Sequence, residues 1–412
     1  MAQREQPTPQ RVPILWAEIR NFLSLRDVQV GLGPLNVLVG PNGGGKSNFL
    51  SVFRFLGEVA RTDLAPAIET LFGGYAELRY RASGRAGEGV SIRLTGRISE
   101  HSSDNAPDEY ELRFQPVGGR ARGTVLRRNE TLILKRTQGR GRRITLSGRR
   151  YEFVDEQSSA RAPRGGASET GTVAPDASAL SVLRRIGEAT DTRQVAALAA
   201  VFESLRLFDP QVSLARQPAV EDTGPLRADA GNLAAVLARW QHNAPDLVAA
   251  IADDLRDILP GFQDFVFTRL NGSGAVRVDL NEHGLSGTTP LIRASYGTVR
   301  AIALLAMLRD PNPPRLTCLE EIDHGLHPHA LDVVVERLRE AAERSQIILA
   351  THSPALVNRL QPEEIIVFER DAKDSSTRVI QRDPEVLRRM SAASGLGLGE
   401  LWFSGTLGGV PR

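Results

Sequence analysis

Residues 40–47, GPNGGGKS, constrain the fold of this chain more than any other stretch. They follow an apolar run, Leu35–Val39, that predicts a buried strand. They precede residues 47–56, which predict a helix with Phe49, Phe53 and Leu56 on one face. Glycines allow the backbone to curl so that successive N–H groups converge on phosphate oxygens, and the N-terminus of the next helix adds its positive end. The three segments together predict a site for the phosphates of a nucleoside triphosphate.

Two side chains of this loop have distinct expected roles. Lys46 is expected to reach the β- and γ-phosphates and to serve catalysis, and the Ser47 hydroxyl is expected to ligate Mg²⁺. A chance glycine-rich turn is the alternative, and the flanking strand and helix argue against it. The expected nucleotide-binding residues here are Gly40, Pro41, Asn42, Gly43, Gly44, Gly45, Lys46, Ser47 and Asn48.

Length and composition predict a soluble globular chain in a reducing compartment. The 412 residues have room for two or three domain-sized units, and 41% of them are hydrophobic while 24% are charged. The single cysteine, Cys318, excludes an internal disulfide framework. Residues 1–13 lack the apolar core of a signal peptide, and the apolar run 301–308 is too short to span a bilayer. We therefore expect a cytoplasmic protein without a membrane partner.

Residues 75–155 predict a set of antiparallel strands. Apolar and polar side chains alternate in residues 76–81, 90–95 and 110–115, which is the period of a half-buried strand. Between residues 118 and 151, ten arginines and Lys135 face Glu130 alone, a local net charge of +10 in a chain whose overall net charge is +2. Such a cluster can contact nucleic-acid phosphates, and the alternative is a solvated strand face. The candidate DNA-binding residues are Arg127, Arg128, Arg136, Arg142 and Arg143.

The remaining chain divides by composition and periodicity. Residues 1–155 are expected to form the first part of an ATPase lobe, and residues 156–179, rich in Ser, Ala, Gly and Pro, a flexible linker or loop. Residues 180–298 are expected to form an inserted helical lobe, although residues 262–280 have strand character. Residues 299–412 are expected to return to the first lobe.

Residues 316–321 predict a second buried strand, and it ends in two carboxylates, Glu320 and Glu321. Glu320 is expected to hold the Mg²⁺ shell, and Glu321 to orient and polarise the attacking water, because adjacent side chains at a strand end diverge. His352, which follows a third apolar strand, is expected to hydrogen-bond the γ-phosphate. One alternative is a charged strand end at the surface. Another is a separate zinc site among the acidic and histidine residues of the stretch 320–329, which lacks the spacing of dedicated zinc motifs.

These motifs occur in the order typical of ABC-type ATPases. Residues 40–47 look like the Walker A motif, Ser295-Tyr296-Gly297-Thr298 like the signature, residues 316–321 like Walker B, and Thr351-His352-Ser353 like the switch histidine. The set of four is specific. The resemblance implies an α/β fold of the P-loop NTPase, ABC-ATPase type, with a mixed sheet, an antiparallel β subdomain and an inserted helical lobe.

Within that class, three stretches resemble the soluble SMC/RecF/OLD branch. They are residues 20–22 (RNF), 320–328 (EEIDHGLHP) and 351–354 (THSP), and the last two are most similar to OLD-type ATPases of phage defence and DNA metabolism. Related ATPases often place a residue of the RNF loop against the adenine, and Phe22 as a core residue is the alternative. Only 60 residues follow His352, so we expect no C-terminal Toprim nuclease in this chain.

The resemblance implies a mechanism in which ATP joins two subunits. Ser295 and Gly297 would bind the γ-phosphate held by a second copy of the chain, giving an ATP-dependent homodimer or a higher even oligomer. The protein would be the sensor or motor subunit of a DNA-directed defence or repair system, and a separate effector nuclease would complete it. The alternatives are a nucleotide-gated scaffold that restrains a toxin partner and, less favoured, a transporter subunit.

Several positions depart from the family pattern. The signature reads Ser-Tyr-Gly-Thr where transporters have Ser-Gly-Gly-Gln, and Glu320 stands where aspartate is usual. The loop after Walker B ends Gly325-Leu326-His327 rather than Ala-Leu-Asp. The glutamine loop has no clear position, and Gln115 is the one candidate.

Overall fold

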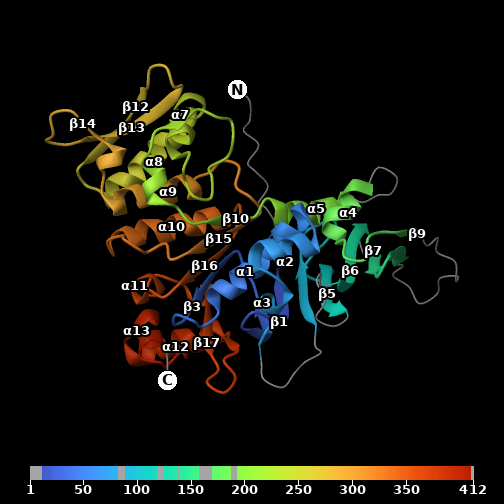
Figure 1. Cartoon of the computed structure of the whole chain (residues 1–412). Helices are drawn as coiled ribbons and strands as arrows, with labels where there is room; N and C mark the ends of the chain where they lie inside the picture. The colour runs from blue at the N-terminus through green and yellow to red at the C-terminus, as the bar shows by residue number, and fades with distance from the viewer. Residues whose placement is uncertain are drawn as a thin grey trace.

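The computed structural model describes residues 12–81, 89–117, 125–137, 140–156, 169–186 and 193–409. Two large sheets organise these residues, and helices pack between and around them (Figure 1). The antiparallel sheet extends to the right in Figure 1, and the helices of the C-terminal half lie on the other side of the central sheet. The expected α/β architecture, with a mixed sheet and an antiparallel subdomain, is confirmed.

In the described residues the central sheet has six strands, and one of its inner strands leads to the phosphate loop. Its first five strands run parallel, and the last is antiparallel to its neighbour. Parallel strands covered on both faces are apolar throughout, and the side chains of Leu35–Val39 are all buried. In spatial order the strands are β10 (Arg206–Phe208), β15 (Leu316–Glu320), β16 (Gln346–Thr351), β3 (Leu35–Val39), β17 (Ile365–Arg370) and β18 (Thr377–Ile380).

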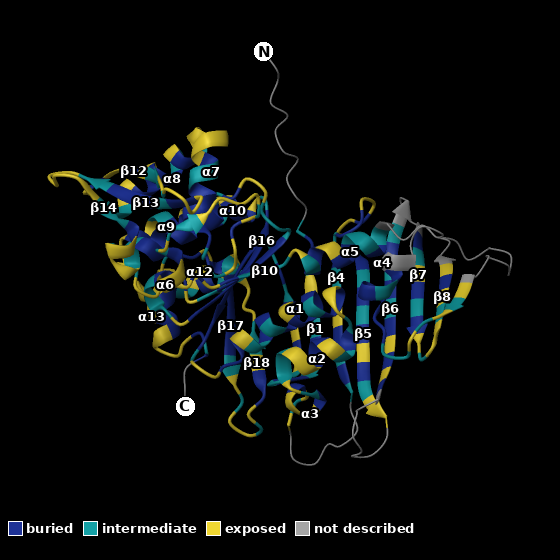
Figure 2. Ribbon diagram, turned by 45° about the horizontal axis from the view of Figure 1, so that its top comes forward, coloured by how far each residue is buried: buried dark blue, intermediate teal, exposed yellow. Residues whose placement is uncertain are grey.

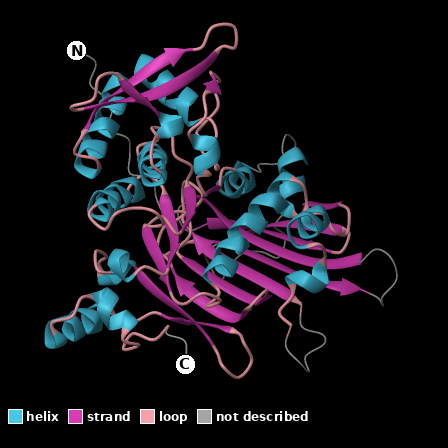
Figure 3. Cartoon of the chain, turned by 60° about the vertical axis from the view of Figure 1, so that its left-hand side comes forward, coloured by secondary structure: helices cyan, strands magenta, loops and turns pink. Residues whose placement is uncertain are grey.

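The second sheet is antiparallel and has eight strands. The alternation of buried and exposed residues expected for residues 90–95 and 110–115 is confirmed in β4 and β5. The order is β2 (Leu25–Gly31), β1 (Trp16–Phe22), β4 (Val90–Gly96), β5 (Asp108–Val117), β6 (Val125–Thr137), β7 (Arg140–Ser147), β8 (Arg150–Glu156) and β9 (Glu169–Thr172). Its apolar face packs against α1 (Lys46–Arg61), α2 (Leu64–Phe72), α4 (Ala179–Ile186) and α5 (Arg193–Glu203), which lie across it in Figure 3.

The other face of the central sheet packs on helices of the C-terminal half. These are α7 (Leu233–Asn243), α8 (Pro245–Ile258), α9 (Tyr296–Leu308) and α10 (Ala330–Ala342). Helix α9 is buried along its whole length from Val299 onward, as the dark ribbon in Figure 2 shows. A small sheet of β11 (Ala219–Val220), β13 (Ala275–Glu282), β12 (Phe262–Arg269) and β14 (Thr288–Pro290) lies beside them. Within the described residues, no helix has the length and apolar character that crossing a membrane requires.

Two expectations about secondary structure were wrong. Residues 75–78 form a short helix, α3 (Tyr75–Leu78), because Gly73 and Gly74 reverse the chain at φ of 73° and 133° and the buried residues, Tyr75 and Leu78, are three apart. The expected linker contains strand β9, although residues 157–168 of it lie outside the described part. Near the C-terminus, where the sequence predicted no helix, the chain forms α12 (Pro384–Ser394) and α13 (Leu398–Phe403).

The expected helical lobe 180–298 is divided among three parts of the fold. Its first helices, α4 and α5, pack on α1 and belong to the core of the antiparallel sheet. Strand β10 then enters the central sheet next to β15. Residues of the expected lobe pack in the core that contains α7 and α8 only from Phe208 onward. The correction follows from burial: the apolar faces of α4 and α5 complete a core whose other residues come from residues 14–153 and three strands of the central sheet.

Candidate functional site

The phosphate loop lies at the carboxyl end of β3, directly before α1. Gly43 and Gly45 have φ of 77° and 99°, in the left-handed region that favours glycine. A Cβ on Gly45 would also lie 1.9 Å from the Thr377 Oγ1 of β18, so the loop is packed against the last strand of the sheet. Only glycine fits this position.

The Lys46 side chain folds back over the loop. It is 9% exposed, and its Nζ donates hydrogen bonds to the carbonyls of Gly40 (2.6 Å) and Pro41 (3.0 Å). Burial lowers the pKa of the Lys46 ammonium, while the nearby carboxylates of Glu321 and Glu320 act in the opposite direction. The charge is thus held inside the loop, where a phosphate would approach.

The ends of three parallel strands meet at this loop. The Ser47 Oγ donates a hydrogen bond to the Glu320 Oε2 at 3.0 Å, which joins the start of α1 to the end of β15. The His352 Nδ1, just beyond β16, lies 3.3 Å from the Glu321 Oε1. The parallel register of β15, β16 and β3 places these carboxyl ends at one edge of the sheet.

The two glutamates point to different partners because the backbone turns between them. Glu321 has φ of 49°, unusual for a residue with a side chain, and its N–H donates to the carbonyl of Ala350 at 2.9 Å. Glu320 therefore faces Ser47, and Glu321 faces His352. Two residues on, the carboxylate of Asp323 accepts a hydrogen bond from the Thr351 hydroxyl at 3.0 Å, so the loop after β15 is tied to the end of β16.

The residues present fit a nucleotide with Mg²⁺. A cavity of about 290 Å³ is lined by residues 42–48, Glu320, Glu321 and Ala350. The hydroxyl of Ser47 and the carboxylate of Glu320 are adjacent oxygen donors, which is the ligand chemistry that Mg²⁺ prefers. Lys46 and the amides of a glycine-rich loop supply positive charge on the other side of the cavity.

The signature turn lies outside this cavity in the same subunit. Ser295 is exposed and caps α9, its Oγ accepting a hydrogen bond from the Thr298 N–H at 3.1 Å. Tyr296 lines a neighbouring cavity of about 410 Å³ together with Arg300, Glu320, Glu321 and His324. Neither Ser295 nor Gly297 lines the cavity around the phosphate loop.

Comparison with known families decides the assignment. A family model described as "AAA domain, putative AbiEii toxin, Type IV TA system" matches residues 35–358, which include the phosphate loop, the signature turn, both glutamates and His352. The chain belongs to this AAA family. No curated protein matches its sequence.

Heads of SMC proteins are among the solved structures whose fold is similar to that of this AAA family member. The Smc head bound to the C-terminal winged-helix domain of ScpA has a TM-score of 0.55 at 12% identity, covering 91% of this chain and 99% of that one. The Pyrococcus furiosus Smc head with an extended coiled coil, bound to the C-terminal domain of ScpA, has a TM-score of 0.51 at 11% identity, covering 93% and 100%. The ABC-type ATPase fold is thereby confirmed, and the narrower OLD-type resemblance stays a prediction.

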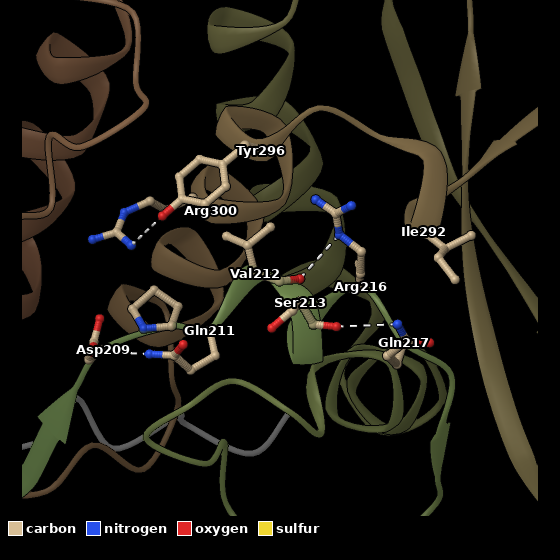
Figure 4. A pocket seen from close by; sticks show the side chains of 10 residues that line it. Asp209, Gln211, Val212, Ser213, Arg216, Gln217, Ile292, Tyr296 and Arg300 are labelled. Carbon is tan, nitrogen blue, oxygen red and sulfur yellow. Dashed lines mark hydrogen bonds between the residues drawn. The ribbon is translucent and has the colours of Figure 1, made fainter.

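Two cationic or amide side chains near the AAA site were not predicted. Arg370, at the end of β17, places its Nη1 3.7 Å from the position that a Cβ on Gly43 would take. Gln211 follows β10, the strand beside β15, and its side chain donates to Asp209 in the cavity drawn in Figure 4. Gln115, the candidate for the glutamine loop, instead lies in β5 and lines a different hollow with Arg127 and Asn129. For Gln211 the available sequence signal was a glutamine close after the apolar residues Leu207 and Phe208, within the expected helical lobe.

The candidate DNA-binding arginines do not form one patch. Arg128 is fully buried in the AAA domain and donates to the carbonyls of Gly148 (3.0 Å) and Ala174 (3.5 Å), so its assignment to DNA was wrong. Buried and exposed residues alternate along β6, so the adjacent Arg127 is exposed. On β7, Arg143 is exposed, whereas Arg142 stacks over the Phe153 ring at 5.8 Å. The side chain of Arg136 lies outside the described part of the structure.

Two other expectations for the AAA site have structural outcomes. Phe22 is fully buried and packs against Phe55 and Phe72, which is the alternative role as a core residue. The three residues 20–22 end strand β1 rather than forming a loop. In the described segments no three His, Cys, Asp or Glu side chains converge as metal ligands.

Proposed function

We propose that this protein is a cytoplasmic, Mg²⁺-dependent ATPase that hydrolyses ATP to ADP and phosphate and pairs with a second copy around the bound nucleotide. The observation that carries the proposal is the meeting of three strand ends. Ser47 contacts Glu320 at 3.0 Å, and Glu321 lies 3.3 Å from His352 beside the phosphate loop. Ser47, Glu320 and Glu321 line one cavity and His352 lies against Glu321, which supports a site with metal ligands, a base and a histidine.

The proposal assigns a role to each side chain of the site. Lys46 and the loop amides bind the phosphates, and Ser47 and Glu320 hold Mg²⁺, which neutralises charge on the phosphate oxygens. Glu321 orients water and accepts its proton at the carboxylate. His352 holds the Glu321 carboxylate in place and donates to the γ-phosphate. The positions of Ser47, Glu320, Glu321 and His352 support these roles.

Pairing around ATP is supported by the position of the signature turn. Ser295 is exposed at the N-terminus of α9, a 13-residue helix, and is absent from the lining of its own phosphate cavity. A helix N-terminus with a serine and a glycine is a good anion site. We therefore propose that Ser295 and Gly297 bind the γ-phosphate held by the other copy.

Ser295→Arg is expected to abolish ATP-dependent pairing, because the long cation replaces the cap and fills the surface that would receive the partner's phosphate. The measurement is the mass in solution with and without ATP, in a Glu321→Gln background that slows turnover. Ser273→Arg, a change at an exposed serine in the turn between β12 and β13, is the matched control. Unchanged pairing in Ser295→Arg would contradict a signature site acting in trans.

We further propose that the pair acts in a DNA-directed defence or repair system with a separate effector protein such as a nuclease. One of the similar structures is an Smc head bound to a domain of ScpA, which supports a partner for this fold. The OLD-like sequence motifs support the DNA-directed role. A pull-down from the native host that recovers no nuclease would count against the effector.

Non-specific DNA binding is proposed for the exposed face of β6 and β7. Arg127→Glu combined with Arg143→Glu is expected to weaken DNA binding and to lower the slope of log affinity against log salt by about 1 for each phosphate that the variant no longer binds. The measurement is a salt titration of duplex binding, and Arg269→Glu with Arg382→Glu, two exposed arginines elsewhere, is the control. An unchanged slope would contradict DNA binding by this face and would favour the alternative of a solvated strand face.

A nucleotide-gated scaffold that restrains a toxin partner is the second candidate. The description of the matching family names a toxin of a type IV toxin–antitoxin system, which supports a function connected with a toxin. The two candidates differ in turnover: a scaffold predicts the same negligible rate in the unmodified protein and in Glu321→Gln.

A further inference from the structure

The first turn of α9 and the loop after β15 interlock through two glycines. A Cβ on Gly297 would lie 2.3 Å from the carbonyl oxygen of Gly325. A Cβ on Gly325 would lie 2.6 Å from the Cδ1 of Tyr296, and Gly325 itself has φ of 78°. The Tyr296 ring therefore occupies the space that any side chain at residue 325 would need. The two departures from the transporter pattern, tyrosine in the signature and glycine after Walker B, fit each other sterically.

Arg300, one turn further along α9, holds the backbone of Glu321. Its side chain is 4% exposed, and its Nη2 donates to the Glu321 carbonyl at 2.8 Å. Its Nη1 lies 3.5 Å from the Tyr296 hydroxyl, the contact drawn in Figure 4. An arginine in this otherwise uncharged helix carries a desolvation cost, and the hydrogen bond to Glu321 offsets part of it.

Tyr296 supports this arrangement from the other side. Its hydroxyl lies 3.4 Å from the His324 Nδ1, and the two rings meet edge to face with centroids 5.7 Å apart. The backbone N–H of His324 donates a hydrogen bond to the same Glu321 carbonyl at 3.1 Å. The Glu321 carbonyl thus receives one hydrogen bond from α9 and one from its own loop.

These contacts matter because Glu321 has a backbone conformation that must be held. A non-glycine residue at φ of 49° persists only where its surroundings fix it. The carbonyl of Ala350 fixes the Glu321 N–H, and Arg300 with His324 fixes the Glu321 carbonyl. The direction of the Glu321 carboxylate toward His352 depends on the hydrogen bonds at both its N–H and its carbonyl.

We propose that Arg300 is a positioning residue for Glu321, and that Tyr296 transmits the state of the signature turn to it. This inference rests on the proposed ATPase function and deepens it. Contact of Ser295 with the partner's nucleotide fixes the position of the first turn of α9. Through Arg300 that turn sets the backbone of Glu321 in the same subunit. Hydrolysis at one site is then coupled to occupancy of the other.

Arg300→Ala is expected to lower kcat by about 10- to 100-fold, the size of effect that misplacing a catalytic group produces. The affinity for ATP and ATP-dependent pairing are expected to stay within about twofold, because Arg300 does not line the phosphate cavity. Arg300→Lys, which keeps one donor within reach of the carbonyl, is expected to recover part of kcat. A kcat that stays unchanged in Arg300→Ala, or a loss of affinity equal to the loss of kcat, would overturn the proposal.

A steric exchange tests the part played by Tyr296. Gly325→Ala alone is expected to lose turnover, because the new Cβ meets the tyrosine ring and the backbone has a positive φ. Adding Tyr296→Gly removes the ring, so the double variant is expected to turn over faster than Gly325→Ala. Gly284→Ala is the control: it has φ of 81°, and no atom lies within 4 Å of its new Cβ. A double variant no faster than Gly325→Ala would refute the steric complementarity.

The failure of this inference can be told apart from failure of the proposed function. If the unmodified protein shows no ATP turnover, the proposed function fails before any variant is made. If turnover is present and falls in Glu321→Gln but not in Arg300→Ala, only the coupling fails. Melting temperatures of each variant exclude loss of the fold as the cause.

Discussion

Glu321→Gln is expected to reduce the rate of ATP turnover by about 10²- to 10⁴-fold, the contribution typical of a general base. Glutamine keeps the size of the side chain and its contact with His352, which lies 3.3 Å from the Glu321 carboxylate, but it accepts no proton. Binding of ATP and pairing are expected to survive, and the pair is expected to persist longer. Phosphate release and the mass in solution measure the two effects.

The control for this experiment is Glu343→Gln. Glu343 is an exposed glutamate at the end of α10, it does not line the phosphate cavity, and the change has the same chemistry. A large loss of turnover in Glu321→Gln with none in Glu343→Gln supports the assignment. Equal rates in all three proteins would remove Glu321 from the mechanism and would favour the scaffold.

Lys46→Ala is expected to abolish nucleotide binding and, with it, turnover and pairing. The ammonium of Lys46 is buried inside the loop, so the alanine variant loses the cation expected to contact the β- and γ-phosphates. Thermal unfolding with and without ATP measures binding, because a ligand at 100 times its Kd stabilises the folded state by about 2.7 kcal/mol. That shift is expected to vanish in Lys46→Ala.

Lys373→Ala supplies the matched control, since the chain has few lysines and Lys373 is exposed in the hairpin between β17 and β18. Its thermal shift with ATP is expected to equal that of the unmodified protein. A full ATP-dependent shift in Lys46→Ala would show that the nucleotide binds elsewhere or not through this loop.

The sequence was sufficient for three strands of the central sheet and for the places where they end. Leu35–Val39, Leu316–Glu320 and Gln346–Thr351 are short apolar runs that end at polar residues, and each became a buried parallel strand. Because parallel strands align their carboxyl ends, the order of motifs along the chain was enough to bring Ser47, Glu320 and Glu321 together.

Other features depended on contacts that no local pattern reveals. Strand β10 has three residues and is a strand only because β15 lies beside it. Arg128 is of the residue type that contacts nucleic-acid phosphates, yet its position on the inner face of β6 buries it. The role of Arg300 had one available signal, a single charge inside the apolar helix α9, which requires a partner that only the fold supplies.

The position of β3 in the sheet has a consequence for how the protein is made. Its neighbours in the described sheet, β16 and β17, begin at residues 346 and 365, more than 300 residues later in the chain. During synthesis the strand that carries the phosphate loop therefore waits without these partners until the ribosome has added the last strands. The complete candidate site cannot assemble before Glu320, Glu321 and His352 have been synthesised, and such late long-range pairing makes folding slow. Any chaperone that binds the emerging chain would find residues 35–39 as an exposed apolar segment for most of that time.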